Sequence, residues 1–242
     1  MDLFIVFEGG EGTGKSTQAK VLYNRLRRDK NYKNSLVYTY EPGGTFFGEI
    51  LRRIVTSPEG GVKATPTESS QLLLVAPPLG DQAVPDVILG PTAPRAEFLY
   101  FLLARAQLVE EVIKPNLGKG KIVICDRYAP SSVAYQGYGR GLDLKLIHEA
   151  NSIATQDIEP DLIVLLDLKE VEKGITRKWG TSRPHRQEQE ELAFHQRVRE
   201  GYLKLAASDP QRWLVVDASQ SKRKIAQIIW QRISQLLSHG KG

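Results

Sequence analysis

The sequence lacks most of the features that mark secreted or membrane-spanning proteins. It contains one cysteine in 242 residues, which excludes an internal disulfide and a zinc site built from several cysteines. No apolar run approaches the roughly 20 residues that a membrane helix needs. The apolar run at residues 3–7 is too short for a signal peptide, and no basic residue precedes it. We therefore expect a cytoplasmic protein with no membrane partner.

The sequence also has no long run of lysine or arginine and no RNA-binding motif. It nevertheless carries 33 basic and 28 acidic residues, a net charge of +5, which favours an anionic partner. Without a nucleic-acid motif, small phosphorylated ligands are the favoured class, and nucleic acid is not expected as a partner. The hydrophobic content of 41% and the charged content of 25% are ordinary for a globular protein, so a disordered chain is excluded.

Strand-like and helix-like segments alternate along the chain. Short apolar runs predict five strands, at residues 3–7, 35–39, 121–125, 162–166 and 213–216, the first of them buried on both faces. Helical spacing predicts helices at residues 18–28, 46–55, 95–113, 143–156, 170–178, 187–207 and 222–237, the third of which ends before Pro115. This alternation is typical of an α/β fold in which a five-stranded parallel sheet is flanked by helices. We expect a single domain over residues 1–242.

Residues 58–94 interrupt the alternation. They hold seven of the 13 prolines and show no helical period. A loop of this length inside a compact domain is unusual and is either functional or disordered. Its apolar pieces at 72–75 and 87–89 allow two short edge strands, but a surface insertion is the simpler interpretation.

A glycine-rich segment follows the first expected strand. Residues 9–16 read GGEGTGKS and fit the phosphate-binding pattern G-x-x-x-x-G-K-[ST], the P-loop, between a strand and a helix. Glycines let backbone N–H groups turn toward phosphate oxygens, while Lys15 reaches the β and γ phosphates and the Ser16 hydroxyl binds Mg²⁺. The residues expected to bind the nucleotide are Gly9, Gly10, Glu11, Gly12, Thr13, Gly14, Lys15, Ser16 and Thr17. The N-K-x-D by which a GTPase reads guanine does not occur.

Two further motifs follow expected strands. Residues 41–45 read EPGGT and residues 126–137 read DRYAPSSVAYQG, and ligands bind at the carboxyl ends of strands in open α/β sheets. Together with FEGGEGTGKST and DLIVLLD, these motifs resemble the thymidylate kinase family over nearly the whole chain except 58–94. The resemblance implies a P-loop nucleoside monophosphate kinase fold and a homodimer. It also implies in-line transfer of a phosphoryl group from ATP, with Mg²⁺, to dTMP, giving dTDP for DNA synthesis.

The resemblance assigns a dTMP site residue by residue. Arg127 and Arg52 would hold the phosphate, because a planar guanidinium suits bidentate phosphate binding. Phe101 would stack on thymine and Arg105, on the same helix face, would hydrogen-bond its carbonyl edge. From spacing alone, Phe101 is more typical of a core residue, and the resemblance favours the thymine-stacking role. Tyr135 would leave no room for a 2′-hydroxyl. The full expected set is Glu41, Pro42, Arg52, Phe101, Arg105, Arg127, Ser131, Tyr135 and, beside the base, Gln136.

The resemblance also assigns the metal and the catalytic groups. Asp126, with Ser16, would hold Mg²⁺ or its waters. Glu11 would lie near the acceptor sugar and phosphates. Because Asp126 adjoins an arginine, a local structural ion pair is an alternative, and Glu11 has the alternative of a solvated loop charge. The expected catalytic residues are Lys15, Arg127, Arg186 and Glu11.

Arg186 belongs to a basic segment at residues 177–188 that resembles a nucleotide-kinase lid. The P-loop interior supplies no arginine, so the resemblance is to bacterial members that take a catalytic arginine from the lid. Arg186 matches that role best, and Arg183 or Arg177 can share it. The alternative is a solvated charged loop. One position departs from the family, since Tyr40 stands where arginine often precedes EPGGT.

Two other functions are compatible with a P-loop. One is a kinase of another mononucleotide or of a nucleoside, and the other is a catalytically silent protein that binds nucleotides or associates with DNA. The Phe101–Arg105 pair argues against the first. The intact set of Lys15, Ser16 and Asp126 argues against the second.

Overall fold

The computed structural model describes residues 2–56, 93–179 and 192–239, and in it five parallel strands form one sheet. The strand order is β2-β3-β1-β4-β5, with β1 paired to β3 and β4 on its two sides. The bounds are β1 (Leu3–Glu8), β2 (Leu36–Tyr40), β3 (Ile122–Asp126), β4 (Leu162–Asp167) and β5 (Trp213–Asp217). The predicted α/β fold with a five-stranded parallel sheet is confirmed.

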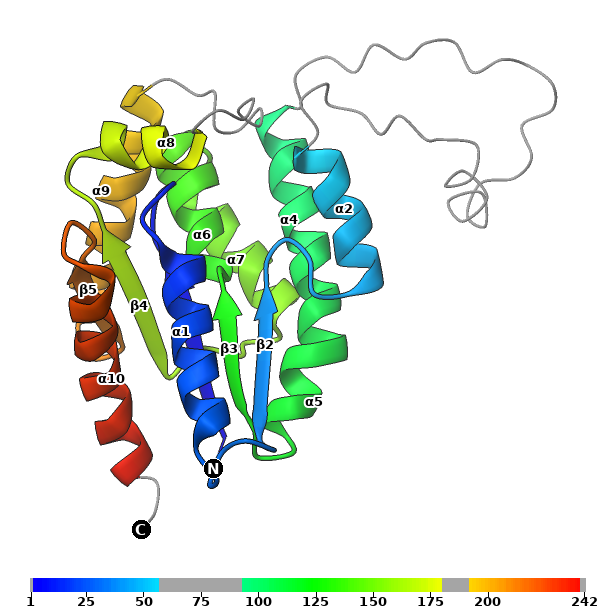
Figure 1. The fold of residues 1–242 in the computed structure, drawn as a ribbon. Helices are drawn as coiled ribbons and strands as arrows, with labels where there is room; N and C mark the ends of the chain where they lie inside the picture. The colour runs from blue at the N-terminus through cyan, green and yellow to red at the C-terminus, as the bar shows by residue number, and fades with distance from the viewer. Residues whose placement is uncertain (1, 57–92, 180–191, 240–242) are drawn as a thin grey trace, which may run out of the picture.

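Helices cover both faces of this sheet (Figure 1). Along β1, Leu3, Ile5 and Phe7 pack with α1 and α10, whereas Phe4 and Val6 pack with α4 and the turn after it. Alternate residues of a strand point to opposite faces, so an entirely apolar strand is buried on both. The longer helices are α1 (Lys15–Arg28), α2 (Phe46–Thr56), α4 (Pro94–Leu108), α7 (Leu144–Thr155), α8 (Val171–Trp179), α9 (Leu192–Ser208) and α10 (Lys222–His239).

The helix that begins at Pro94 does not end before Pro115, so that prediction is wrong. It continues through a π-helical turn, η1 (Val109–Ile113), into α5 (Lys114–Leu117). A proline lacks the N–H for the helical bond and clashes with the carbonyl four residues earlier. The wider π turn just before Pro115 accommodates the ring, and the Asn116 side chain donates a 2.7 Å hydrogen bond to the Val112 carbonyl. The helix therefore gains one turn beyond the proline.

The expected edge strands at 72–75 and 87–89, most of the segment 58–94, and residues 180–188 of the lid-like segment lie outside the described residues. The long helix expected at 187–207 is described from Leu192 to Ser208. Within the described ranges, no helix combines the length and apolar character needed to cross a membrane. The carboxyl ends of β1, β2 and β3 meet at one edge of the sheet, which brings the three sequence motifs together.

Candidate active site

The P-loop joins β1 to α1 as its sequence predicts. Gly14 adopts φ +90°, a left-handed conformation that glycine tolerates, and α1 begins at the next residue, Lys15. Gly12 also has a positive φ, and a Cβ there would lie 1.8 Å from the Gly174 carbonyl oxygen of α8. The loop thus lies directly against the backbone of α8. The Lys15 ammonium donates to the Gly10 carbonyl at 3.2 Å and is held over the loop.

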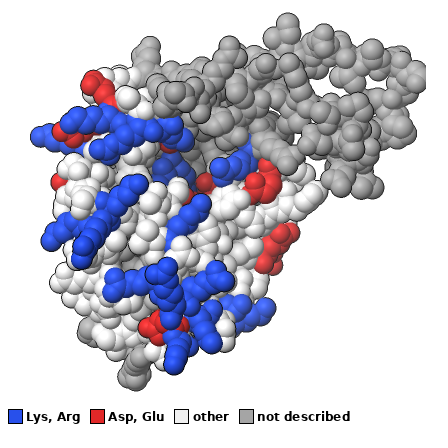
Figure 2. All heavy atoms as spheres, viewed as in Figure 1, with Lys and Arg blue, Asp and Glu red and all other residues white. Residues whose placement is uncertain are grey.

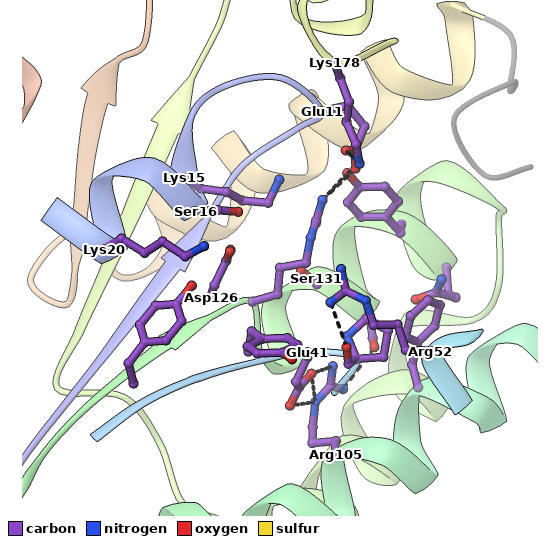
Figure 3. A pocket seen from close by; sticks show the side chains of 18 residues that line it. Glu11, Lys15, Ser16, Lys20, Glu41, Arg52, Arg105, Asp126, Ser131 and Lys178 are labelled. Carbon is purple, nitrogen blue, oxygen red and sulfur yellow. Dashed lines mark hydrogen bonds and ion pairs between the residues drawn. The ribbon is translucent and has the colours of Figure 1, made fainter. Parts of the chain in front are cut away.

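A pocket of about 760 Å³ opens beside the P-loop (Figure 3). All nine expected substrate-binding residues line it, together with the expected catalytic or metal residues Glu11, Lys15, Ser16 and Asp126. Arg186 lies outside the described residues. Gly10 and Thr13 instead border a small cavity on the β4 side of the loop. The described lining residues are Glu11, Lys15, Ser16, Lys20, Tyr38, Tyr40, Glu41, Pro42, Arg52, Phe101, Arg105, Asp126, Arg127, Ser131, Ser132, Tyr135, Gln136 and Lys178.

Glu11 is at the centre of a cluster of charged groups at the top of the pocket in Figure 3. Its Oε1 accepts hydrogen bonds from Arg127 and from the Tyr135 hydroxyl, both at 2.6 Å, and its Oε2 accepts from Lys178 at 2.7 Å. Burial alone would raise the pKa of Glu11, but Lys15, Arg127 and Lys178 lower it well below the usual glutamate value. Glu11 is therefore a buried carboxylate held ionised, which contradicts the alternative of a solvated loop charge.

Arg127 occupies an unusual backbone position at the end of β3. Its φ is +76°, which is rare for a residue with a side chain and costs on the order of 1–3 kcal/mol that the surrounding contacts must offset. The surroundings include Glu8, the last residue of β1, which is fully buried. Its carboxylate accepts from the Tyr128 N–H at 2.9 Å, the Ser131 hydroxyl at 2.7 Å and the Tyr202 hydroxyl at 2.8 Å. Glu8 thus fixes the chain on the carboxyl-terminal side of Arg127.

The Arg127 guanidinium is only partly engaged by the protein. Nη2 donates to Glu11 and to Tyr135, and Nη1 donates to Ser131 at 3.3 Å. A guanidinium has five hydrogens. The described part of the chain therefore leaves the hydrogen on Nε and one on Nη1 for a ligand in the pocket.

Arg105 is different, because it is 1% exposed and its hydrogens are all engaged. Nε and Nη2 bind the Glu41 carboxylate, the Nη2–Oε2 distance being 2.6 Å. The second Nη2 hydrogen goes to the Tyr128 carbonyl, and the two on Nη1 go to Ser132 and Asn151. Arg105 lines the pocket four residues after Phe101 on α4, but a hydrogen bond to a thymine carbonyl would have to replace one of these partners.

Tyr40, the departure from the family pattern, supports Arg52. Its hydroxyl donates a 2.6 Å hydrogen bond to Glu49, and its ring lies under the Arg52 guanidinium with Cζ 5.2 Å from the ring centre. Arg52 also donates to the Pro42 carbonyl at 3.3 Å. An aromatic face attracts a cation, so tyrosine holds Arg52 at the pocket edge.

The residues expected to hold Mg²⁺ lie together near Lys15. Ser16 and Asp126 both line the pocket, and Figure 3 shows them on the side that faces α1. Asp126 Oδ1 is buried and has no hydrogen-bond partner within the described ranges. A buried carboxylate oxygen without a donor fits a cation or its water ligands. The neighbouring Arg127 pairs with Glu11, so the alternative of a local Asp126–Arg127 pair is not observed.

Four polar residues that contact the site were not among the expected site residues. They contact expected site residues that lie up to 167 residues away in the sequence, and they are Glu8, Lys178, Ser132 and Asn151. Glu8 had a usable signal, because a carboxylate that ends an otherwise apolar buried strand requires partners. Ser132 and Lys178 lie within a quoted motif and the lid-like segment, whereas Asn151 lies in neither. On the face viewed in Figure 2, lysine and arginine side chains are more prominent than acidic ones, in keeping with an anionic ligand.

Comparisons with known proteins find relatives over nearly the whole chain. The sequence profile of the family described as Thymidylate kinase matches residues 7–76 and 86–229. A thymidylate kinase of Dehalococcoides mccartyi is 41% identical over 238 residues, covering 98% of each chain. One of Thermomicrobium roseum is 40% identical over 242 residues, covering 100% of this chain and 99% of the relative. The crystal structure of thymidylate kinase from Ehrlichia chaffeensis superposes with a TM-score of 0.67 at 28% identity, covering 96% of this chain and 98% of that one.

Proposed function

Since this chain belongs to the thymidylate kinase family and phosphorylates dTMP to dTDP with ATP, we propose that dTMP binds in the 760 Å³ pocket beside the P-loop. The observation that supports this placement is the pocket lining. It joins Lys15 and Ser16 of the P-loop to two arginines, Arg52 and Arg127, and to the half-buried aromatic ring of Phe101. A nucleoside monophosphate needs cations for its phosphate and an apolar surface for its base.

In this arrangement Arg127 is the main ligand of the dTMP phosphate, through the two hydrogens that the protein leaves available. Glu11 and Tyr135 fix the other side of the guanidinium, so its orientation is set before substrate arrives. Arg52, supported by Tyr40, binds the same phosphate from α2. Phe101 provides the surface on which thymine stacks, and Tyr135 lies against the sugar. No protein base is required, because the attacking group is already a phosphate oxyanion.

ATP would lie across the P-loop, with its β and γ phosphates near the backbone of residues 9–16 and the Lys15 ammonium. Ser16 and Asp126 would hold Mg²⁺, which when bound neutralises charge on the phosphate oxygens of ATP. The protein contributes alignment of donor and acceptor and fixed positive charge around the transferring group.

We propose that residues 1–242 form one catalytic domain, with residues 58–94 as an insertion and 177–188 as a lid. Only the base of the proposed lid is described, where Arg177 and Lys178 lie in the last turn of α8. Arg186 is proposed as the lid's catalytic cation. A homodimer is proposed from the family resemblance, with mass determination by light scattering as its test. The cytoplasm, where ATP and dTMP are both present, is the proposed location, and no nucleic-acid partner is proposed.

The placement of dTMP is tested by steady-state kinetics on Arg127→Ala, measured as ADP release with ATP and dTMP. Loss of a charge-assisted contact to phosphate should raise the KM for dTMP by roughly 10- to 100-fold, since hydrogen bonds to charged groups contribute about 1.5–3 kcal/mol. The KM for ATP should change little. Arg212→Ala, at the amino end of β5, serves as the control and should behave as wild type. An Arg127→Ala protein with an unchanged KM for dTMP would place the acceptor elsewhere.

A further inference from the structure

We propose that Glu97 is a positioning residue that sets the base preference of the enzyme by fixing the side-chain amide of Gln136. The inference rests on the proposed placement of dTMP in the pocket. It concerns how the edge of the pyrimidine is read, a task for which Arg105 has no hydrogen to spare.

Glu97 and Gln136 are both buried, at 4% and 2% exposed. Gln136, in the π-helical segment η2 (Val133–Gly139), donates from Nε2 to Glu97 Oε1 at 2.9 Å. The other carboxylate oxygen of Glu97 accepts from Arg140 at 3.0 Å. A carboxylate paired with arginine only accepts hydrogen bonds, so the NH₂ group of Gln136 must face Glu97. Its carbonyl oxygen must then turn away.

That carbonyl oxygen accepts no hydrogen bond from the part of the chain that the structure describes, and Gln136 lines the pocket. Glu97, Phe101 and Arg105 are spaced by four residues on α4, so they lie along one face of the helix. The amide of Gln136 is therefore anchored one turn from Phe101, the ring proposed to stack on the base. An acceptor of fixed orientation lies next to the base platform.

The chemistry of pyrimidines explains what such an acceptor selects. Thymine and uracil carry a hydrogen on N3, whereas N3 of cytosine is itself an acceptor. A fixed carbonyl accepts from the N3–H of dTMP and opposes the N3 lone pair of dCMP. An amide that turned freely would present its NH₂ to cytosine and lose this discrimination. Glu97 prevents the turn without touching the nucleotide.

The test is the ratio of kcat/KM for dTMP to kcat/KM for dCMP in wild type and in Glu97→Gln, with dUMP as a second substrate. A glutamine at position 97 both donates and accepts, so the Gln136 amide becomes free to turn. The dTMP:dCMP ratio should fall by roughly 10- to 100-fold, the range for one mispaired buried polar group. The dTMP:dUMP ratio should stay unchanged, because both bases present N3–H. Glu111→Gln, the same change on the exposed continuation of this helix, should leave both ratios at wild type.

The ratio of kcat/KM values for two substrates does not depend on the fraction of protein that is folded. Destabilisation of the fold through loss of the Glu97–Arg140 ion pair therefore cannot by itself produce the predicted pattern. Gln136→Met is the second variant; it keeps the size and the Glu97–Arg140 pair but removes the acceptor. It should lower kcat/KM for dTMP and dUMP, but not for dCMP. If Gln136→Met narrows the dTMP:dCMP ratio and Glu97→Gln does not, the role of Glu97 is wrong. If neither variant moves the ratio while Arg127→Ala still weakens dTMP binding, the inference fails and the proposed pocket stands.

Discussion

Lys15 illustrates how strongly the site changes the properties of a single side chain. It is 7% exposed, and burial together with the neighbouring charge of Arg127 lowers its pKa to about 8, despite the opposing effect of Glu11. A lysine in water titrates near 10.4. The cation that must meet the ATP phosphates is therefore partly lost at mildly alkaline pH in the free enzyme.

We expect kcat/KM for ATP to fall above about pH 8, since this parameter reports the protonation of the free enzyme. The profile of kcat should extend to higher pH, because bound phosphates favour the charged form of Lys15. Measurement of both parameters from pH 6.5 to 9.5 checks this. Lys15→Arg, which cannot lose its charge in this range, should remove the descending limb even if its activity is low. A wild-type kcat/KM that stays flat to pH 9.5 would contradict the expectation.

At the residue scale, the sequence predicted the pocket-lining groups that are adjacent in the chain and missed contacts that form only through the fold. Lys15, Ser16 and Glu11 lie within one loop, and Arg127 and Tyr135 lie within one motif, so spacing and resemblance found them. Glu8 accepts from the Tyr128 N–H, 120 residues away, and Lys178 donates to Glu11 from 167 residues away. No local pattern records such a contact, which depends on strand order and on the packing of α8.

The contact between the P-loop and α8 is a property of two elements. A Cβ on Gly174 would lie 2.4 Å from the Glu11 carbonyl oxygen, and a Cβ on Gly12 would meet the Gly174 carbonyl. Backbone therefore packs on backbone here, and this close packing places Lys178 beside Glu11. The lid-like segment, residues 177–188, begins in the last turn of α8.

Gly174→Ala should separate α8 from the P-loop. Overpacking of this kind costs about 1–3 kcal/mol, which corresponds to a fall in Tm of roughly 2–12 °C for a protein of this length. We also expect kcat/KM for ATP to fall by about tenfold, because the loop must shift. Gly118→Ala is a matched control, since its nearest neighbour would lie at an ordinary 3.4 Å. If Gly174→Ala keeps the wild-type Tm and the wild-type kcat/KM for ATP, the P-loop and α8 separate at little cost in free energy.

The lid arginine is the second prediction at this scale. Charge spreads over the transferring phosphoryl oxygens, and the P-loop interior offers no cation beyond Lys15. Arg186→Ala should lower kcat by roughly 10²–10³, with little change in the KM for dTMP, the pattern of a contact made in the transition state. Arg183→Ala should be less affected. If Arg183→Ala is the impaired variant, the alignment of the lid is wrong, and if neither loses more than a few-fold, the cation comes from another segment.

For the whole molecule, the prediction succeeded because every strand is a short, largely apolar run, and the three central strands β1, β3 and β4 are buried. The five strands lie within one or two residues of their expected bounds, and parallel pairing follows from the helices between them. The extension of the helix past Pro115 was missed because it depends on a π turn, and a π turn has no period that apolar spacing can show. The two helical turns after β3, α6 (Ala129–Ser132) and η2, were likewise absent from the expected helices.

The last prediction concerns the segment between α2 and α4. The described lining of the pocket comes from both sides of it, with Arg52 on α2 and Phe101 on α4, and these two helices pack against each other. Replacing residues 60–90 with a Gly/Ser linker of about ten residues should therefore keep most of the dTMP kinase activity. The change in loop-closure free energy is only about 1 kcal/mol, because this cost grows with the logarithm of length. Kinetics, melting and mass by light scattering would be compared with wild type. A folded variant that has lost activity would show that the segment supports the site. A variant that is also monomeric by light scattering, where wild type is dimeric, would show that the segment supports a dimer.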